Sequence, residues 1–256
     1  MKQTQIIMGV PIVIDIRTKE ATEELFAKVF TYFRYVDEKF STYKDTSEIT
    51  AINQKKIKNT EWSDDMKLIF KLAEETKHLT HGYFDIKTPS GVYDTSGLVK
   101  GWTIFNAANI LKDNGIKNFY VEAGGDIQTY GKNEEDKTWC IGIQNPFNKK
   151  REIVKKVYLR DNGIATSGTY IRGEHIYNPM NKNEPINDIV SLTVIGPNIF
   201  EADRYATAAF AMGNIGIQFI ENLENFEGYA IDKNGIATMT TGFNNYTKDP
   251  NKKNHA

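Results

Sequence analysis

The chain has 256 residues, of which 40% are hydrophobic and 25% are charged, a composition typical of a soluble globular protein with a substantial core. Its 32 Lys and Arg residues balance 33 Asp and Glu residues without any basic run, which argues against nucleic acid as a partner. Cys140 is the only cysteine, so an internal disulfide and a metal site built from cysteines are excluded.

No stretch of the sequence has the length and apolar character of a transmembrane helix. The N-terminus also lacks a sustained apolar segment followed by small residues at a cleavage site. As written, the sequence therefore predicts a cytoplasmic protein, and a signal or lipoprotein segment that was removed stays an open alternative.

The N-terminal residues 6–16 are rich in Ile and Val and predict a strand with a kink at Gly9 and Pro11. Met8 and Gly9 could bring the backbone close to a ligand, but a glycine inside a strand pattern more often marks a bulge. Apolar residues then recur three and four positions apart over residues 21–41, which predicts a long helix with one buried face.

Two further helices follow. A short helix is expected to end near Ile52 and to be capped by one of residues 45–47. Tyr43 precedes it in a loop, where the ring either stacks on a flat ligand or packs against the protein. A longer helix is predicted from Ser63 to His81.

The segment 94–131 joins two polar turns through one predicted helix. The first turn holds Asp94 and Lys100, the helix ends at about residue 114, and a short strand then ends in GGD at 124–126. Glycines let backbone groups approach a ligand, while Lys100 and the carboxylates supply opposite charges for phosphate and a cation. The segment suits a phosphorylated, metal-bound ligand, although such glycine pairs also occur in ordinary turns.

A second candidate site is the alanine-rich helix predicted from Ile199 to Met212. Asp203 and Thr207 lie four residues apart in it and therefore share one face. An unpaired buried aspartate is costly, so Asp203 is expected to pair with a cation or with a base such as Arg204.

The remaining pattern indicates the fold class. Short β-type segments separated by turn residues fill residues 127–178, which favours an α+β layout over a doubly wound sheet. A hairpin turning at 233–235 follows, and residues 244–256 are expected to form a disordered tail.

Seven segments occur in an order that resembles a known family: MG near the start, FSTYKDTSEITAIN, GYFDIKT, DTSGLVKG, EAGGDIQTYG, TSGTYIRGEHIYNP and EADRYATAAFAMG. The order is similar to that of the ApbE-type flavin transferases, the FAD:protein FMN transferases. The resemblance implies one domain over residues 1–243, with mixed or antiparallel sheets flanked by helices and a ligand cleft between two subregions.

The resemblance also implies an activity. The FAD pyrophosphate would be split with Mg²⁺, the FMN phosphoryl group would pass to a Thr or Ser hydroxyl of a target flavoprotein, and AMP would be released. The implied metal ligands are Asp203, Thr207 and the backbone oxygen of Gly97, and oxygen ligands of this kind suit Mg²⁺.

The resemblance assigns roles to further residues. His175, Lys100 and Asp203 are the expected catalytic residues, with His175 a candidate general base and Lys100 a counter-charge for the pyrophosphate. The expected FAD-binding residues are Met8, Tyr43, Tyr83, Phe84, Asp85, Asp94, Lys100 and His175. Two other functions remain open for the same residues: an FAD pyrophosphatase that yields FMN and AMP, and a non-enzymatic flavin carrier.

Overall fold

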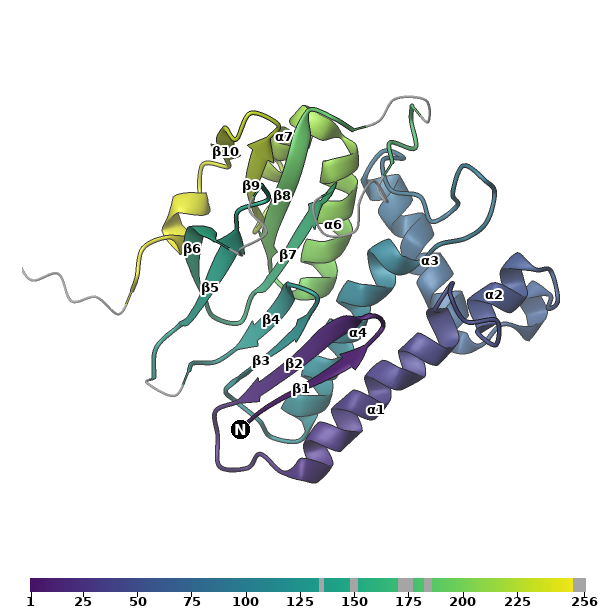
Figure 1. The fold of residues 1–256 in the computed structure, drawn as a ribbon, viewed down its shortest axis with the longest axis horizontal. Coiled ribbons are helices and arrows are strands. Elements are labelled where there is room, and N and C mark those ends of the chain that lie inside the picture. Colours follow the sequence, from purple (N-terminus) through teal and green to yellow (C-terminus); the bar gives the residue numbers. More distant parts are fainter. Residues whose placement is uncertain (134–135, 148–151, 170–176, 182–185, 251–256) are drawn as a thin grey trace, which may run out of the picture.

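A computed structural model describes residues 1–133, 136–147, 152–169, 177–181 and 186–250. Within these residues, eight strands form one sheet in the order β1-β2-β3-β4-β7-β8-β9-β10, and every neighbouring pair is antiparallel (Figure 1). The strands are β1 (Lys2–Ile7), β2 (Val10–Ile16), β3 (Phe119–Ala123), β4 (Asp126–Tyr130), β7 (Gly163–Gly168), β8 (Ile189–Gly196), β9 (Glu227–Asp232) and β10 (Ala237–Met239).

The N-terminal segment forms a hairpin, so the prediction of one kinked strand is wrong. Met8 and Gly9 have φ angles of 57° and 71°, and a two-residue hairpin turn of type I′ requires such left-handed angles at both positions. Ile7 pairs with Val10 directly across this turn. A glycine between two apolar runs is compatible with either a bulge or a turn. The second run forms a strand of its own here, since β2 pairs with β3 as well as with β1.

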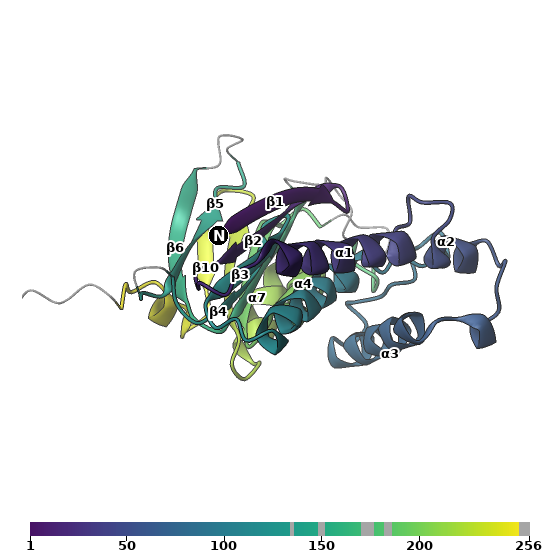
Figure 2. The same cartoon turned by 90° about the horizontal axis from the view of Figure 1, so that it is seen from below.

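Helices cover one face of the sheet. In the core beneath them, three phenylalanines of α1 pack with alternate residues of β2, β3 and β8. Figure 2 shows α1 and α4 side by side along this face. The helices are α1 (Glu23–Phe40), α4 (Ser96–Asp113), α6 (Ile199–Ala211) and α7 (Gly216–Glu221), with the 3-10 turn η2 (Gly213–Ile215) before α7. The helix α7 has no counterpart among the sequence predictions.

The opposite face of the sheet carries a second, smaller sheet of β5 (Trp139–Gln144) and β6 (Ile153–Leu159). Successive side chains of a strand point to opposite faces of the sheet. The small sheet therefore contacts Ile164, Ile195 and Ile231 of the large sheet, while their immediate neighbours face the helices. The 3-10 helix η3 (Phe243–Tyr246) joins this core, and the Phe243 ring stacks on Tyr229 at 5.4 Å. The predicted start of a disordered tail at residue 244 therefore falls inside this helix.

A helical region stands beside the sheet and consists of α2 (Glu48–Asn53), the 3-10 turn η1 (Asn59–Glu61) and α3 (Asp64–Leu79). Ser47 caps α2 and Ser63 caps α3, each by accepting a backbone N–H bond, which confirms both predicted starts. The helix α4 belongs to both parts. Leu98 and Trp102 pack against the helical region, whereas Ile104 and Leu111 pack against the sheet.

The expected α+β class, with antiparallel sheets flanked by helices, is confirmed. In the part of the chain that the structure describes, no helix combines the length and the apolar character needed to cross a bilayer.

Candidate active site

Two adjoining pockets, each of about 200 Å³, lie at the N-terminal end of α4. The first, called the α6 pocket, is lined by segment 83–97, by β7 and by Asp203, Thr207 and Ala211 of α6. The second, called the hairpin pocket, is lined by the β1–β2 turn, by the end of α1 and by residues 41–43. Asp94, Ser96 and Lys100 line both pockets, so the two pockets meet at the start of α4.

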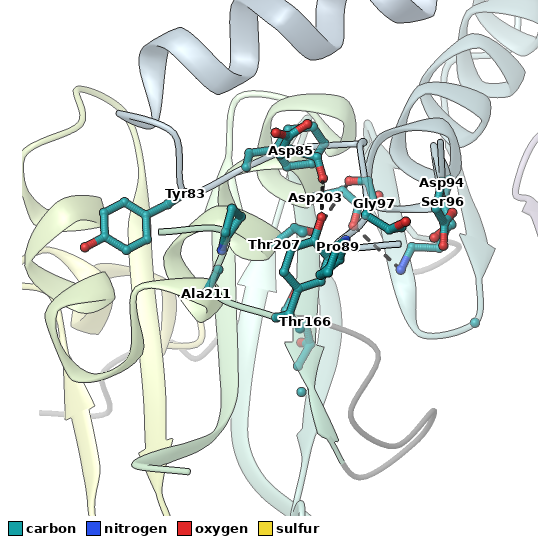
Figure 3. Close-up of a pocket in the computed structure, with 18 residues that line it drawn as sticks. Tyr83, Asp85, Pro89, Asp94, Ser96, Gly97, Thr166, Asp203, Thr207 and Ala211 are labelled. Carbon is teal, nitrogen blue, oxygen red and sulfur yellow. Dashed lines mark hydrogen bonds and ion pairs between the residues drawn. The ribbon is translucent and has the colours of Figure 1, made fainter. Parts of the chain in front are cut away.

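The three oxygen-bearing residues implied as metal ligands lie together in the α6 pocket (Figure 3). Asp203 is only 2% exposed, and the Thr207 hydroxyl lies 3.5 Å from the carbonyl oxygen of Gly97, to which it donates a weak hydrogen bond. A carboxylate, a hydroxyl and a carbonyl form a donor set that fits Mg²⁺, an ion that takes oxygen ligands and leaves positions for water and phosphate. Among the described residues no group of three or more His, Cys, Asp or Glu side chains could hold a metal, so no competing site of that type is present there.

Close packing of α4 on α6 at Gly101 brings these residues together. A Cβ atom at Gly101 would lie 2.6 Å from Asp203 Cβ and 2.9 Å from the Ile199 carbonyl oxygen, so a side chain does not fit. The N–H of Gly101 donates to Asp203 Oδ2 at 2.8 Å, which fixes the orientation of the carboxylate.

Lys100 lies between two buried carboxylates. Its Nζ atom contacts Asp126 Oδ2 and lies 3.6 Å from Asp203 Oδ1. Asp126 is 1% exposed, and its Oδ1 atom accepts the N–H of Thr166 at 3.0 Å. Asp126 enters the sequence predictions only as part of the GGD turn of segment 94–131, and it is not among the predicted site residues.

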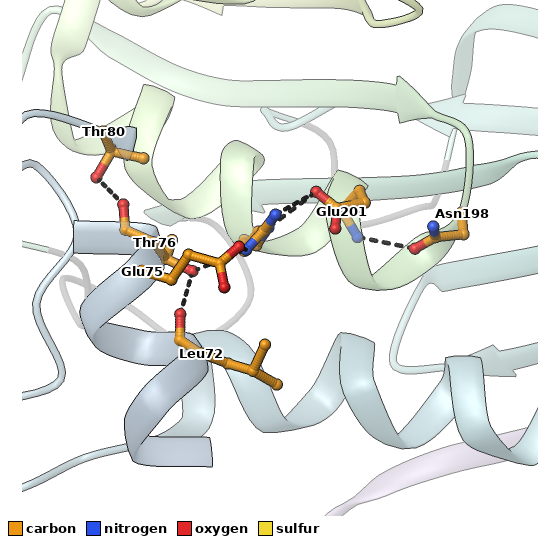
Figure 4. Close-up of polar contacts among 7 residues, drawn as sticks. Leu72, Glu75, Thr76, Thr80, Asn198 and Glu201 are labelled. Carbon is orange, nitrogen blue, oxygen red and sulfur yellow. Dashed lines mark hydrogen bonds and ion pairs between the residues drawn. The ribbon is translucent and has the colours of Figure 1, made fainter. Parts of the chain in front are cut away.

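Arg204 does not provide the alternative partner considered for Asp203. Its guanidinium donates to Glu201 at 2.6 and 2.9 Å and to the Thr76 hydroxyl at 3.3 Å, and it lies 3.5 Å from Glu75. Figure 4 shows Glu201 on α6 facing Glu75 and Thr76 on α3. The arginine thus joins α6 to α3.

The wall of the α6 pocket contains Tyr83, Phe84 and Asp85. The N–H of Phe84 donates to the Thr80 hydroxyl at 3.2 Å. Asp85 pairs with Lys77 at 2.9 Å and accepts the N–H of Lys87 at 2.8 Å, so this carboxylate braces its own loop while it faces the pocket.

Tyr177, which is not among the predicted site residues, holds the same loop. Its hydroxyl donates to the carbonyl oxygens of Asp85 and Lys87 at 3.2 and 3.0 Å. Burial, together with the negative charges of Asp85 and Asp94, raises the pKa of Tyr177 to about 12. The phenol therefore remains protonated at neutral pH, and its one O–H hydrogen is shared between the two carbonyl oxygens.

Comparison with known proteins identifies the relationship. The model of the ApbE family matches residues 8–92 and 87–230. The chain belongs to the ApbE family. Among ApbE relatives, the FAD:protein FMN transferase of Vibrio cholerae is 34% identical over 133 residues, which cover 49% of this chain and 40% of that protein. The Escherichia coli K12 protein of the same description is 28% identical over 166 residues, which cover 62% of this chain and 47% of that protein.

The chain thus spans less than half the length of these two curated ApbE relatives. Solved ApbE structures share the fold over nearly the whole chain. The flavin transferase ApbE from Vibrio cholerae has a TM-score of 0.82 at 23% identity, covering 96% of this chain and 98% of that one. The ApbE protein from Thermotoga maritima has a TM-score of 0.85 at 19% identity, with 97% and 99% covered.

The residues that the ApbE resemblance assigns to FAD divide between the two pockets. Met8 and Tyr43 line the hairpin pocket, whereas Asp94 and Lys100 stand at the junction. The sequence predicts that the Tyr43 ring either stacks on a flat ligand or packs against the protein. The residue is 97% exposed, so it does not pack against the protein. Asp94 also accepts the N–H of Ser96 at 2.9 Å and so helps to start α4. His175 lies outside the described residues, and its assigned role stays a prediction.

Proposed function

We propose that this protein transfers the FMN part of FAD to a Thr or Ser hydroxyl of a target flavoprotein, with Mg²⁺ and with release of AMP. The main supporting observation is that Asp203, Thr207 and Gly97 lie together in the α6 pocket, close to Lys100, which lines both pockets. Membership of the ApbE family supports the same reaction, since relatives of this chain are described as FAD:protein FMN transferases.

The paired pockets suit a dinucleotide. FAD carries two ring systems joined by a pyrophosphate, and in this proposal each pocket would take one of them. The pyrophosphate would then lie at the shared residues Asp94, Ser96 and Lys100. The Lys100 ammonium would balance part of its charge, which is the main task of a protein in phosphoryl transfer.

The reaction forms one bond and breaks one. The acceptor hydroxyl oxygen attacks the phosphorus of the FMN half, the bond from that phosphorus to the bridging oxygen breaks, and AMP leaves with the bridging oxygen. Asp203, Thr207 and the Gly97 carbonyl would hold Mg²⁺, which supplies positive charge to the pyrophosphate oxygens. His175 is the candidate to accept the hydroxyl proton, because an imidazole can take up a proton near neutral pH.

Mass spectrometry of a candidate flavoprotein tests the proposal. After incubation with this protein, FAD and Mg²⁺, we expect one added FMN on a Thr or Ser residue and an equal amount of AMP. The Asp203→Ala variant should give neither product while its far-UV circular dichroism stays native. Undiminished transfer by that variant would remove the metal assignment.

The same incubation without an acceptor separates the other functions. A pyrophosphatase would release FMN and AMP from FAD, and a carrier would retain FAD without forming AMP. For the proposed transferase we expect little AMP until the acceptor is added. Addition of EDTA should stop the reaction and excess Mg²⁺ should restore it, whereas full turnover in chelator would contradict the metal-dependent proposal.

A further inference from the structure

Two buried carboxylates from different elements face one ammonium group. Asp126 begins β4 and Asp203 lies in the middle of α6, while Lys100 reaches them from α4. The Lys100 Nζ atom is in direct contact with Asp126 Oδ2 but lies 3.6 Å from Asp203 Oδ1. The ammonium is therefore held closer to Asp126.

Both carboxylates are fixed by backbone groups. The N–H of Thr166 donates to Asp126 Oδ1 at 3.0 Å, and the N–H of Gly101 donates to Asp203 Oδ2 at 2.8 Å. Lys100, by contrast, extends from a flexible four-carbon stem and its side chain is 19% exposed. Of the three charged groups, the ammonium is the one that can change its position.

The position of the Lys100 ammonium between the two carboxylates affects how well a divalent cation can bind at Asp203. Asp126, Asp203 and Lys100 carry a formal total of one negative charge. If the ammonium paired fully with Asp203, it would occupy that carboxylate and repel an approaching divalent cation. Asp126 gives the ammonium a second buried carboxylate to pair with. The Asp203 carboxylate, which lines the α6 pocket, then remains accessible from that pocket.

We propose that Asp126 is a positioning residue that holds Lys100 and thereby keeps the Asp203 carboxylate available to a divalent cation. This inference rests on the proposed metal role of Asp203 and adds a residue that does not itself contact the metal. The supporting partners of a metal ligand commonly change affinity by roughly 10- to 100-fold when they are mutated.

The test is Asp126→Asn, which removes the charge but keeps the size of the side chain and an oxygen that can accept the Thr166 N–H. We expect Lys100 to turn to Asp203, so that affinity for Mn²⁺, used as a spectroscopic substitute for Mg²⁺, falls roughly 10-fold or more. Calorimetry and electron paramagnetic resonance measure this with the metal alone, without FAD or acceptor. Asp126→Ser provides a second uncharged variant if the first folds poorly.

A double-mutant cycle with Lys100→Met distinguishes positioning from direct attraction. In the Lys100→Met background, Asp126→Asn should change Mn²⁺ affinity by less than about threefold, because no ammonium remains to compete. An equal loss in both backgrounds would show that Asp126 attracts the cation directly, and unchanged affinity in the single variant would also overturn the inference. Normal Mn²⁺ binding by a protein that transfers no FMN would count against the proposed function alone.

Discussion

At Gly101 the backbone of α4 lies against the side chain of Asp203. A Cβ atom added at Gly101 would lie 2.6 Å from Asp203 Cβ and 2.9 Å from the Ile199 carbonyl oxygen. The Ile199 oxygen belongs to the backbone of α6 and cannot rotate away, so a methyl group here must push the two helices apart.

Gly101→Ala should therefore lower the free energy of unfolding by about 1–3 kcal/mol and weaken Mn²⁺ binding, since Asp203 would move relative to Gly97. Urea denaturation and metal titration measure the two effects. For the unfolding measurement alone, Gly97→Ala is the control, because its Cβ atom would lie 3.2 Å from Thr207 Cγ2, a side-chain atom that can shift slightly. An equal loss of stability in the two variants would contradict the role given to the close approach at Gly101.

At the scale of elements, Arg204 links the helix that carries Asp203 to the helix that precedes the pocket wall. It is 5% exposed, and its bond to the Thr76 hydroxyl crosses from α6 to α3. The Thr80 hydroxyl donates to the Thr76 carbonyl at 2.7 Å and accepts the N–H of Phe84 at 3.2 Å. Hydrogen bonds through Thr76 and Thr80 at the end of α3 therefore link α6 to the pocket wall at Phe84.

Arg204→Met should cost about 2 kcal/mol of stability, because it removes charge-assisted hydrogen bonds while it keeps much of the side-chain volume. We also expect the KM for FAD to rise more than kcat falls, since the variant alters the pocket wall but leaves Asp203 and Thr207 in place. Steady-state kinetics with Arg204→Lys as the control measure this. A fall in kcat without a change in KM would argue against the link to the wall.

At the scale of the whole molecule, the candidate site lies where the helical region and the sheet meet. The α6 pocket draws residues from segment 83–97, α6 and β7, and the hairpin pocket draws residues from the β1–β2 turn and the end of α1. A ligand that fills both pockets would therefore hold together elements that are far apart in the chain.

FAD with Mg²⁺ at about 100 times its Kd should stabilise the folded protein by about 2.7 kcal/mol, which raises the Tm of a chain of this size by roughly 5–10 °C. Differential scanning calorimetry measures the shift. Tyr43→Ala should reduce the shift while the Tm without ligand stays the same, because the ring is almost fully exposed. An unchanged shift would remove Tyr43 from the ligand contacts.

Several features followed from the sequence alone, because they depend on neighbours within one or two helical turns. Apolar spacing predicts α1 and α3, and Ser63 is recognisable as a cap since its hydroxyl bonds to an N–H three residues on. Asp203 and Thr207 share a face for the same reason, as they are four residues apart in one helix. The ordered motifs of the ApbE family then indicated which of these residues to group into a site.

Only the tertiary structure decided how distant residues meet. Gly97 and Thr207 are 110 positions apart, and their approach depends on α4 packing against α6 where Gly101 has no side chain. The same holds for the pairing of Lys100 with Asp126 and for the β1–β2 hairpin, whose local composition also fits one bulged strand. Local spacing is set by backbone geometry within a few residues, whereas these contacts exist because separate elements bury their apolar faces against one another and bring their charges into the same pocket.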